Sequence, residues 1–189
     1  MQIRDCYSTE DEFKHFYANI KMLLCPHCRR VGFLVLHGYL YGYAPEEVPL
    51  GCGEADLIQR GRRIFCSNRN NRTGCGGTFS LLLTGCIRNF VISARLLSVF
   101  LEKIRQGFYP AEAARQSGLQ MCTSTVYRLY KKFRLNQSRI RSYLHRLKAP
   151  PPLVDTVNPV IQTLTHLTAA FKPCMVSGFQ HHFQTSFLR

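Results

Sequence analysis

Cys25-Pro26-His27-Cys28 opens the stretch that decides the fold, and Cys66, an eight-residue insert and Cys75-Gly76-Gly77-Thr78-Phe79-Ser80 close it. A Cys-x-x-Cys turn lets two sulfurs reach one ion, and a second pair completes the four ligands that zinc takes in a tetrahedral site. We therefore predict two knuckles that close a zinc ribbon around one Zn²⁺ ion, with Cys25, Cys28, Cys66 and Cys75 as the metal ligands.

Two other residues compete with these cysteines as ligands. His27 lies inside the first pair, and Cys52 lies in a glycine-rich turn whose backbone can approach a metal. The insert from Ser67 to Gly74 consists of Ser, Asn, Arg, Thr and Gly, so we expect it to bulge outward while the flanking cysteines stay close. The alternative to a metal site is that the thiols are reduced and buried as small apolar groups.

The composition favours a folded chain with a polyanionic partner. Of the 189 residues, 46% are hydrophobic, and the net charge is +14. Nucleic acid is the leading partner for such a charge, and an acidic membrane surface is the second. No apolar run approaches the roughly 18 residues of a membrane span. The nine cysteines are odd in number and no leader sequence is visible, so we expect a reducing compartment and a cytoplasmic, nucleoid-associated protein.

The first part of the chain has the pattern of a small β-structure preceded by a helix. Thr9 and Glu12 have capping-box spacing ahead of an apolar stripe, which predicts a short amphipathic helix ending near Leu24. Residues 31–43, 58–65 and 78–83 are rich in apolar, β-branched and aromatic residues. They predict a small antiparallel ribbon of three strands, with one long excursion at 44–53.

Two sets of side chains in this ribbon suggest contacts with nucleic acid. No acid occurs from Leu57 to Leu83, and we expect contacts to phosphate from four arginines of that region, Arg62, Arg63, Arg69 and Arg72. Tyrosines alternate at positions 39, 41 and 43, so they share one face of a strand. Packing is one interpretation of this stripe, and stacking on bases is the other.

The hydrophobic period changes from 2 to 3.6 after Asn89, which predicts an all-α bundle. We expect helices at 91–107, 110–116 and 123–135, the third capped by Thr123. Ala114 and Gly118 have the four-residue offset that is common in helix-turn-helix units. One face of the third helix is an apolar stripe of Val126, Leu129, Tyr130 and Phe133.

The opposite face of residues 123–135 has what a recognition helix needs. Short hydroxyls and a guanidinium near its start can reach base edges, and cations further along can reach phosphates. We therefore expect contacts to DNA from Thr123, Ser124, Thr125, Arg128, Lys131, Lys132 and Arg134. The alternative is an ordinary three-helix packing unit with solvated lysines.

The remaining residues suggest a further helix, a linker and a tail. Residues 137–147 predict a helix that continues the basic face with Arg139, Arg141 and Arg146, and the prolines at 150–152 end it. A short C-terminal helix follows from Asn158, and the tail after Phe171 has no clear period. We divide this α+β chain into a helix and zinc ribbon (1–88), a helix-turn-helix domain (89–149) and a C-terminal segment (150–189).

The order of these motifs resembles the N-terminal DNA-binding region of bacterial insertion-sequence transposases. The resemblance covers about residues 24–134 and rests on the two cysteine motifs followed by a helix-turn-helix. The long insert between Cys66 and Cys75 is its main departure and suggests a side branch. In such proteins the ribbon and the helices bind element ends, so the resemblance implies DNA binding in transposition or recombination.

The catalytic part of such transposases is an acidic triad, which this chain cannot assemble because Asp155 is the one acid after Glu112. We expect a non-enzymatic, zinc-dependent protein that binds double-stranded DNA as an accessory or regulatory factor of transposition or site-specific recombination. A recombinase or transposase and a second copy of the chain are further expected partners, and a membrane is not. Two alternatives stay open: an adaptor that docks on a recombinase or polymerase, and an RNA-binding protein that uses the tyrosine strand.

Overall fold

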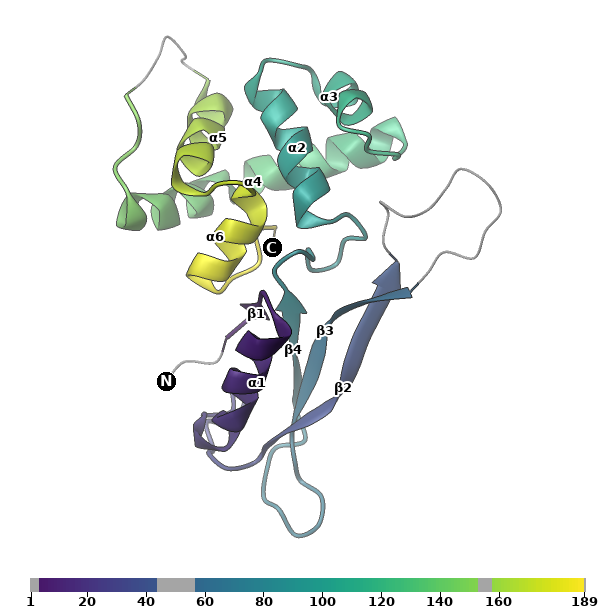
Figure 1. The fold of residues 1–189 in the computed structure, drawn as a ribbon, viewed down its shortest axis with the longest axis vertical. Helices are drawn as coiled ribbons and strands as arrows, with labels where there is room; N and C mark the ends of the chain where they lie inside the picture. Colours follow the sequence, from purple (N-terminus) through teal and green to yellow (C-terminus); the bar gives the residue numbers. More distant parts are fainter. Residues whose placement is uncertain (1–3, 44–56, 153–157, 189) are drawn as a thin grey trace. The chain divides into compact units, whose positions relative to one another are not determined.

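The computed structural model of the protein describes residues 4–43, 57–152 and 158–188. The chain divides into two compact units, Met1–Cys86 and Ile87–Arg189, and each has its own hydrophobic core. The first unit contains a four-stranded mixed sheet and the second is helical, so the fold is α+β as predicted (Figure 1). The division falls just before the predicted one, and residues 158–188 belong to the second unit.

The sheet consists of β1 (Cys6–Tyr7), β2 (Leu34–Tyr43), β3 (Leu57–Cys66) and β4 (Thr78–Leu83) in the order β1-β4-β3-β2. The three predicted strands pair antiparallel, whereas β1 pairs parallel with β4 and makes the sheet mixed. A strand of two residues has no period for the sequence to show, so the prediction missed β1. The expected excursion at 44–53 lies outside the described residues.

Helix α1 (Glu10–Ala18) and the single turn η1 (Ile20–Met22) lead from the sheet edge to the first cysteine pair. As predicted, Thr9 caps α1: its Oγ1 accepts a hydrogen bond from the backbone N–H of Glu12 at 3.2 Å. Phe13 and Phe16 of α1 are buried in the first core, together with Leu34 of β2, Ile64 and Cys66 of β3, and Leu81 of β4.

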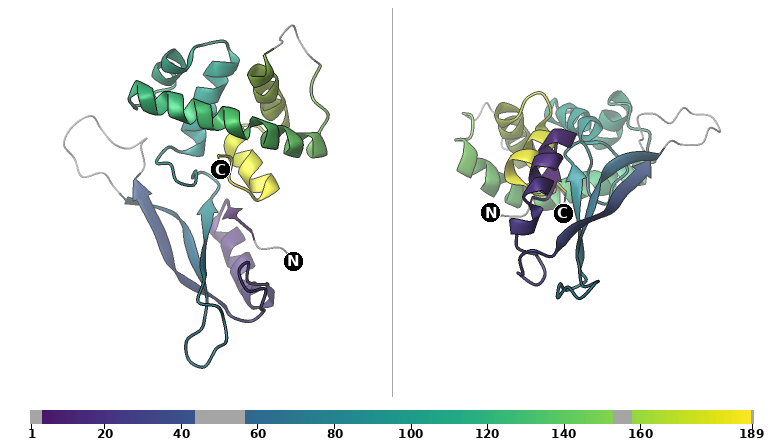
Figure 2. Two further views of the ribbon diagram at one scale, coloured as in Figure 1. Left: turned by 180° about the vertical axis from the view of Figure 1, so that it is seen from behind. Right: turned by 60° about the horizontal axis from the view of Figure 1, so that its bottom comes forward.

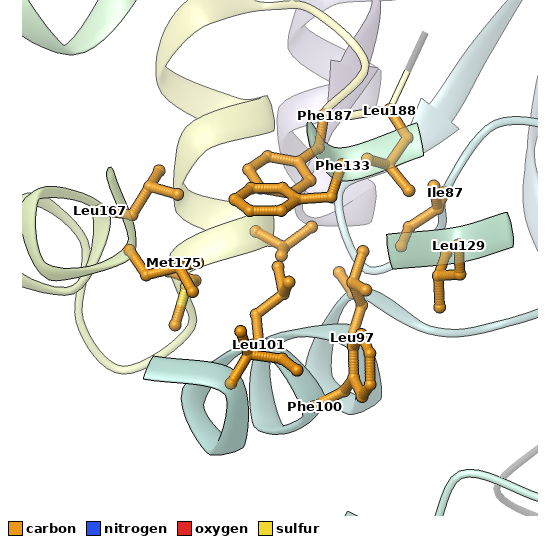
Figure 3. Close-up of a cluster of buried hydrophobic side chains, with 14 of the residues drawn as sticks. Ile87, Leu97, Phe100, Leu101, Leu129, Phe133, Leu167, Met175, Phe187 and Leu188 are labelled. Carbon is orange, nitrogen blue, oxygen red and sulfur yellow. The ribbon is translucent and has the colours of Figure 1, made fainter. Parts of the chain in front are cut away.

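The second unit is built from α2 (Ala94–Arg105), α3 (Pro110–Gln116), α4 (Thr123–Leu147), α5 (Pro159–Ala170) and α6 (Met175–Phe183). Their apolar faces share one core, where Leu97, Phe100 and Leu101 of α2 lie near Leu129 and Phe133 of α4 (Figure 3). Among the helices of the described ranges, none combines the length and the apolar character needed to cross a membrane.

Helix α4 is continuous over 25 residues, where the sequence predicted two helices that meet near residue 136 (Figure 2). Asn136 disfavours helix in isolation. Here its Nδ2 donates to the carbonyl of Lys132 at 3.0 Å, and its side chain is buried. Phe133 and Ile140 carry the buried stripe across the junction, so packing overrides the local propensity.

The C-terminal tail is part of the second core. Residues 175–183 form α6, and the buried ring of Phe187 stacks on that of Phe133 with the ring centroids 6.0 Å apart (Figure 3). Arg139 of α4 donates to the carbonyls of Ser186 at 2.8 Å and Phe187 at 2.7 Å. The tail is therefore anchored by both apolar packing and hydrogen bonds.

Candidate metal centre and nucleic-acid interface

Four cysteine thiols meet in the first unit. The Sγ atoms of Cys25, Cys28, Cys66 and Cys75 all lie within 4.8 Å of one another. The Sγ atoms of Cys25 and Cys75 are 3.8 Å apart, and so are those of Cys28 and Cys66. Four sulfurs that surround one zinc ion at about 2.3 Å are about 3.8 Å from each other. The cluster therefore has dimensions that fit a single metal ion.

The first cysteine pair is set in a tight turn. The N–H of Arg29 donates to the carbonyl of Cys25 at 2.9 Å, and the N–H of Cys25 donates to the carbonyl of Arg30 at 2.9 Å. Arg29 has a φ of 61°, in the left-handed region that folds the chain back. This turn brings the thiols of Cys25 and Cys28 to the same side.

The second pair stays close because the insert folds back on itself. The N–H of Gly74 donates to the carbonyl of Ser67 at 3.1 Å, which closes a loop at the base of the insert. A side chain at Gly74 would begin 2.3 Å from that carbonyl oxygen, so glycine is required there. The N–H of Cys75 then points to the Cys66 Sγ at 3.4 Å. The insert therefore bulges outward, as predicted.

Backbone donors and burial act in opposite directions on these thiols. Hydrogen bonding from the Arg30 backbone lowers the pKa of the Cys28 thiol to about 7, which favours the thiolate that a metal needs. Burial raises the pKa of the Cys66 thiol to about 12, so this sulfur is a poor thiolate without a nearby cation. A bound dication would supply that charge.

Of the two alternative ligands, His27 and Cys52, the structure describes only His27. The His27 Nε2 lies 3.2 Å from the carbonyl oxygen of Thr78, and its ring packs over Gly77, outside the thiol cluster. Cys52 lies outside the described residues. Within the described ranges, the four predicted cysteines are the set of side chains that could hold a metal ion.

Exposed cations surround the thiol cluster. Arg69 and Arg72 lie in the insert, and Arg29 and Arg30 follow the first pair. Arg30 donates to the carbonyl of Thr73, which ties the two loops together. Burial, and next the charge of Arg72, lower the pKa of Lys21 on η1, so Lys21 belongs to the same basic surface. We call these five residues, Lys21, Arg29, Arg30, Arg69 and Arg72, the knuckle cations.

Arg62 is a correction to the expected phosphate contacts. Its side chain is 7% exposed and forms an ion pair with Glu10 of α1. The guanidinium lies over the rings of Phe13 and Tyr39, at 4.3 and 4.5 Å from their centroids. Arg62 is therefore paired within the first unit, and its guanidinium is not exposed for a contact with phosphate. Its neighbour Arg63 is exposed and stays a candidate.

The exposed side of α4 collects most of the predicted contacts to DNA. Thr123, Ser124, Arg128, Lys131 and Arg134 are exposed, while Val126, Leu129 and Phe133 are buried on the other side. The described part of this unit has two acidic side chains, Glu102 and Glu112, and both pair with arginines of their own helices. The exposed cations Arg128, Lys131 and Arg134 therefore have no carboxylate partner among the described residues of this unit.

The structure revises details at the start of α4. Cys122, and not Thr123, occupies the N-cap position, and no side chain caps the helix there. The half-buried Thr125 accepts a hydrogen bond from the Arg128 Nη2 at 3.0 Å, which positions the guanidinium near the helix start. Lys132 is half-buried, with its Nζ 5.2 Å from the ring centroid of Phe90. Lys132 is thus less exposed to a partner than Lys131.

Two cations of the predicted basic face turn inward. Arg139 binds the C-terminal carbonyls, and Arg141 donates to the Thr163 Oγ1 at 2.7 Å and the Pro159 carbonyl at 2.6 Å. Conversely, Tyr127 was not among the predicted contacts, yet its side chain is 48% exposed between Ser124 and Lys131. The i+3 and i+4 spacing to those residues was the signal that places it on the same face.

Comparison with known proteins adds no family to these observations. No family model, no curated protein and no solved structure matches this chain.

Proposed function

We propose that this chain is a zinc-dependent protein that binds double-stranded DNA. The first unit is a zinc ribbon, in which Cys25, Cys28, Cys66 and Cys75 hold one Zn²⁺ ion. Four thiolates in a closed tetrahedral set are typical of structural zinc sites, because no position is left for water or substrate. The metal then fixes the knuckle cations in place and takes no part in a reaction.

The second unit carries the contacts to DNA. Helices α3 and α4 act as a helix-turn-helix, and α4 enters the major groove with Ser124, Tyr127 and Arg128 near base edges. Lys131 and Arg134 lie further along the same face, where phosphates of the groove walls are in reach. The observation that carries this proposal is the row of exposed cations along α4 with no described carboxylate to neutralise them.

The setting we propose is transposition or site-specific recombination, with the chain as an accessory or regulatory factor. The order of two cysteine knuckles and a helix-turn-helix supports it, through the resemblance to insertion-sequence transposases. The proposed role is non-enzymatic, and a recombinase or transposase bound to the same DNA would supply the chemistry.

The test starts from a duplex selected from a random library by the metal-loaded full chain. Arg128→Ala should weaken binding to the selected duplex by about 1–3 kcal/mol and leave binding to random duplex nearly unchanged. Lys131→Ala and Arg134→Ala should weaken both duplexes alike and each lower the salt slope by about 1.

Lys172→Ala is the matched control, because it removes an exposed cation of the same unit outside α3 and α4. It should leave sequence preference unchanged. Equal losses for Arg128→Ala on selected and random duplex would remove α4 as the recognition helix. A chain that selects no sequence and loses all binding near physiological salt would remove the proposed function.

A further inference from the structure

Among the described residues, the outer edge of β2 has no strand beside it. β2 is the last strand in the sheet order, so no described strand pairs with its outer backbone groups. Native edge strands are usually blunted by lysine, by inward-pointing charge or by proline. The ten residues of β2, Leu34–Tyr43, include no Asp, Glu, Lys, Arg or Pro. This edge has the features of a strand that pairs with another chain.

The second half of β2 is regular enough to pair. The register against β3 shifts twice: once at His37 of β2, and once at Arg60 of β3. Residues 38–43 of β2 therefore run without an extra residue of their own. Bulges are one means by which proteins turn an edge away from pairing; here the extra residue at His37 lies just before the segment, and the extra residue at Arg60 lies on β3, opposite Leu40 and Tyr41.

An aromatic surface borders the same edge. Tyr39, Tyr41 and Tyr43 alternate along the strand, and their side chains are between 49 and 60% exposed. Their neighbour on β3, Leu57, is 61% exposed. Helix α1 buries the other half of this sheet face, at Leu34, Ile64 and Leu81, but β2 runs on away from α1 (Figure 1). An uncovered aromatic stripe next to an open edge marks an interaction surface.

We propose that β2 pairs antiparallel with β2 of a second copy of this chain. A two-fold axis perpendicular to the sheet keeps the tyrosines of both copies on one face, because the side-chain period of a strand is 2. In the register centred on Tyr41, the two Tyr41 side chains oppose each other, and Tyr39 of one copy opposes Tyr43 of the other. Such aromatic cross-strand pairs stabilise sheets.

The sequence of β2 suits pairing with itself. Its tyrosines are spaced symmetrically about Tyr41, so an antiparallel copy places an aromatic ring opposite each of them, and the uncharged strand brings no like charges together. Single-stranded nucleic acid fits the tyrosines less well, because no Lys or Arg lies within β2 to contact its phosphates.

Formation of this dimer does not depend on DNA binding. Only the role of the dimer on a DNA site rests on the proposed function. A protein with two-fold symmetry offers two α4 helices, which suits a DNA site made of inverted half-sites. The test is therefore made on the metal-loaded full chain without DNA, by sedimentation equilibrium over a range of concentrations. Failure of DNA binding would leave its result unaffected.

The chain should sediment with twice its monomer mass. Tyr41→Lys puts two like charges directly opposite each other at the centre of the pairing, and should raise the dissociation constant of the dimer by about tenfold or more. Leu57→Lys is the matched control: it adds the same charge on the same sheet face, but on β3 instead of the edge strand. It should change the dissociation constant by less than about threefold.

Three outcomes would overturn the proposal. One is a monomer at every concentration. Another is an equal loss of dimer for Tyr41→Lys and Leu57→Lys, which would indicate packing through the sheet face instead of edge pairing. The third is a monomer whose tyrosine fluorescence is quenched by oligothymidine or oligouridine, which would make the stripe a platform for unpaired bases; the chain has no Trp to mask that signal.

Discussion

The four cysteines of the candidate metal site were predictable because their chemistry is local. The spacing of Cys25 and Cys28 fixes a turn within four residues, and the polar insert lets Cys66 and Cys75 approach without help from the rest of the chain. Arg62 shows the opposite case. Its partner Glu10 lies 52 residues away in the sequence, and the rings that it covers come from α1 and β2. A row of arginines alone does not tell which one is turned inward.

The difference between Arg62 and an exposed arginine is testable. Arg62→Met should lower the free energy of unfolding of the first unit by about 1–3 kcal/mol, because it removes the ion pair with the half-exposed Glu10 and two contacts of the buried guanidinium with aromatic rings. Urea denaturation of the metal-loaded chain measures it. The salt slope of DNA binding should not change.

Arg72→Ala is the counterpart, since Arg72 is exposed among the knuckle cations. It should leave stability within about 0.5 kcal/mol of the wild type. If Arg72 contacts a phosphate, the salt slope should fall by about 1. If Arg62→Met lowered the slope and left stability unchanged, Arg62 would return to the set of phosphate contacts.

Whole elements were predictable where one stripe of apolar residues repeats over several turns. This is true of α2, of α3 with its proline start, and of the first half of α4. It fails for α6, whose sequence Met175–Phe183 contains a glycine and two histidines and has no dominant period. Gly178 is required there by tertiary packing: a side chain would begin 2.8 Å from the Phe171 Cβ. The helix is thus stabilised by its neighbours and not by its own sequence.

The tail should therefore matter for the stability of the second unit. Phe187→Ala removes a ring that is fully buried against Phe133 and Phe179, and should cost about 3–5 kcal/mol in the free energy of unfolding of that unit. Urea denaturation followed by helical circular dichroism measures it. Leu135→Ala, at a position that is 74% exposed on α4, is the control and should change stability by less than about 0.5 kcal/mol. If the tail did not contribute to the stability of the second unit, both variants would show the same small change in the free energy of unfolding.

The two units differ in net charge and in the functional groups that they carry. Residues 87–189 contain fifteen Lys and Arg against three acids, whereas residues 1–86 contain ten against eight. Most of the net positive charge therefore belongs to the helical unit, and the proposed attraction for DNA would come from there. The sheet unit contributes the thiol cluster, the local group of knuckle cations and the open β2 edge. The composition of the whole chain, with its +14 charge, could not show this asymmetry, because acids of the sheet unit offset its arginines.

Removal of the metal should consequently affect one unit and spare the other. The hydrophobic cores share no residue, and of the four thiols Cys25, Cys28 and Cys66 pack in or against the first core. A chelator should unfold the sheet unit, because holding the two cysteine loops against each other depends on the bound ion. The helical unit should keep its circular dichroism signal and its resistance to limited proteolysis. Cys75→Ser should reproduce the effect and lower the metal content, while Cys122→Ser, at an exposed thiol outside the cluster, should not. If chelation melted both units in one transition, or neither, the metal would not be the structural ion of the first unit alone.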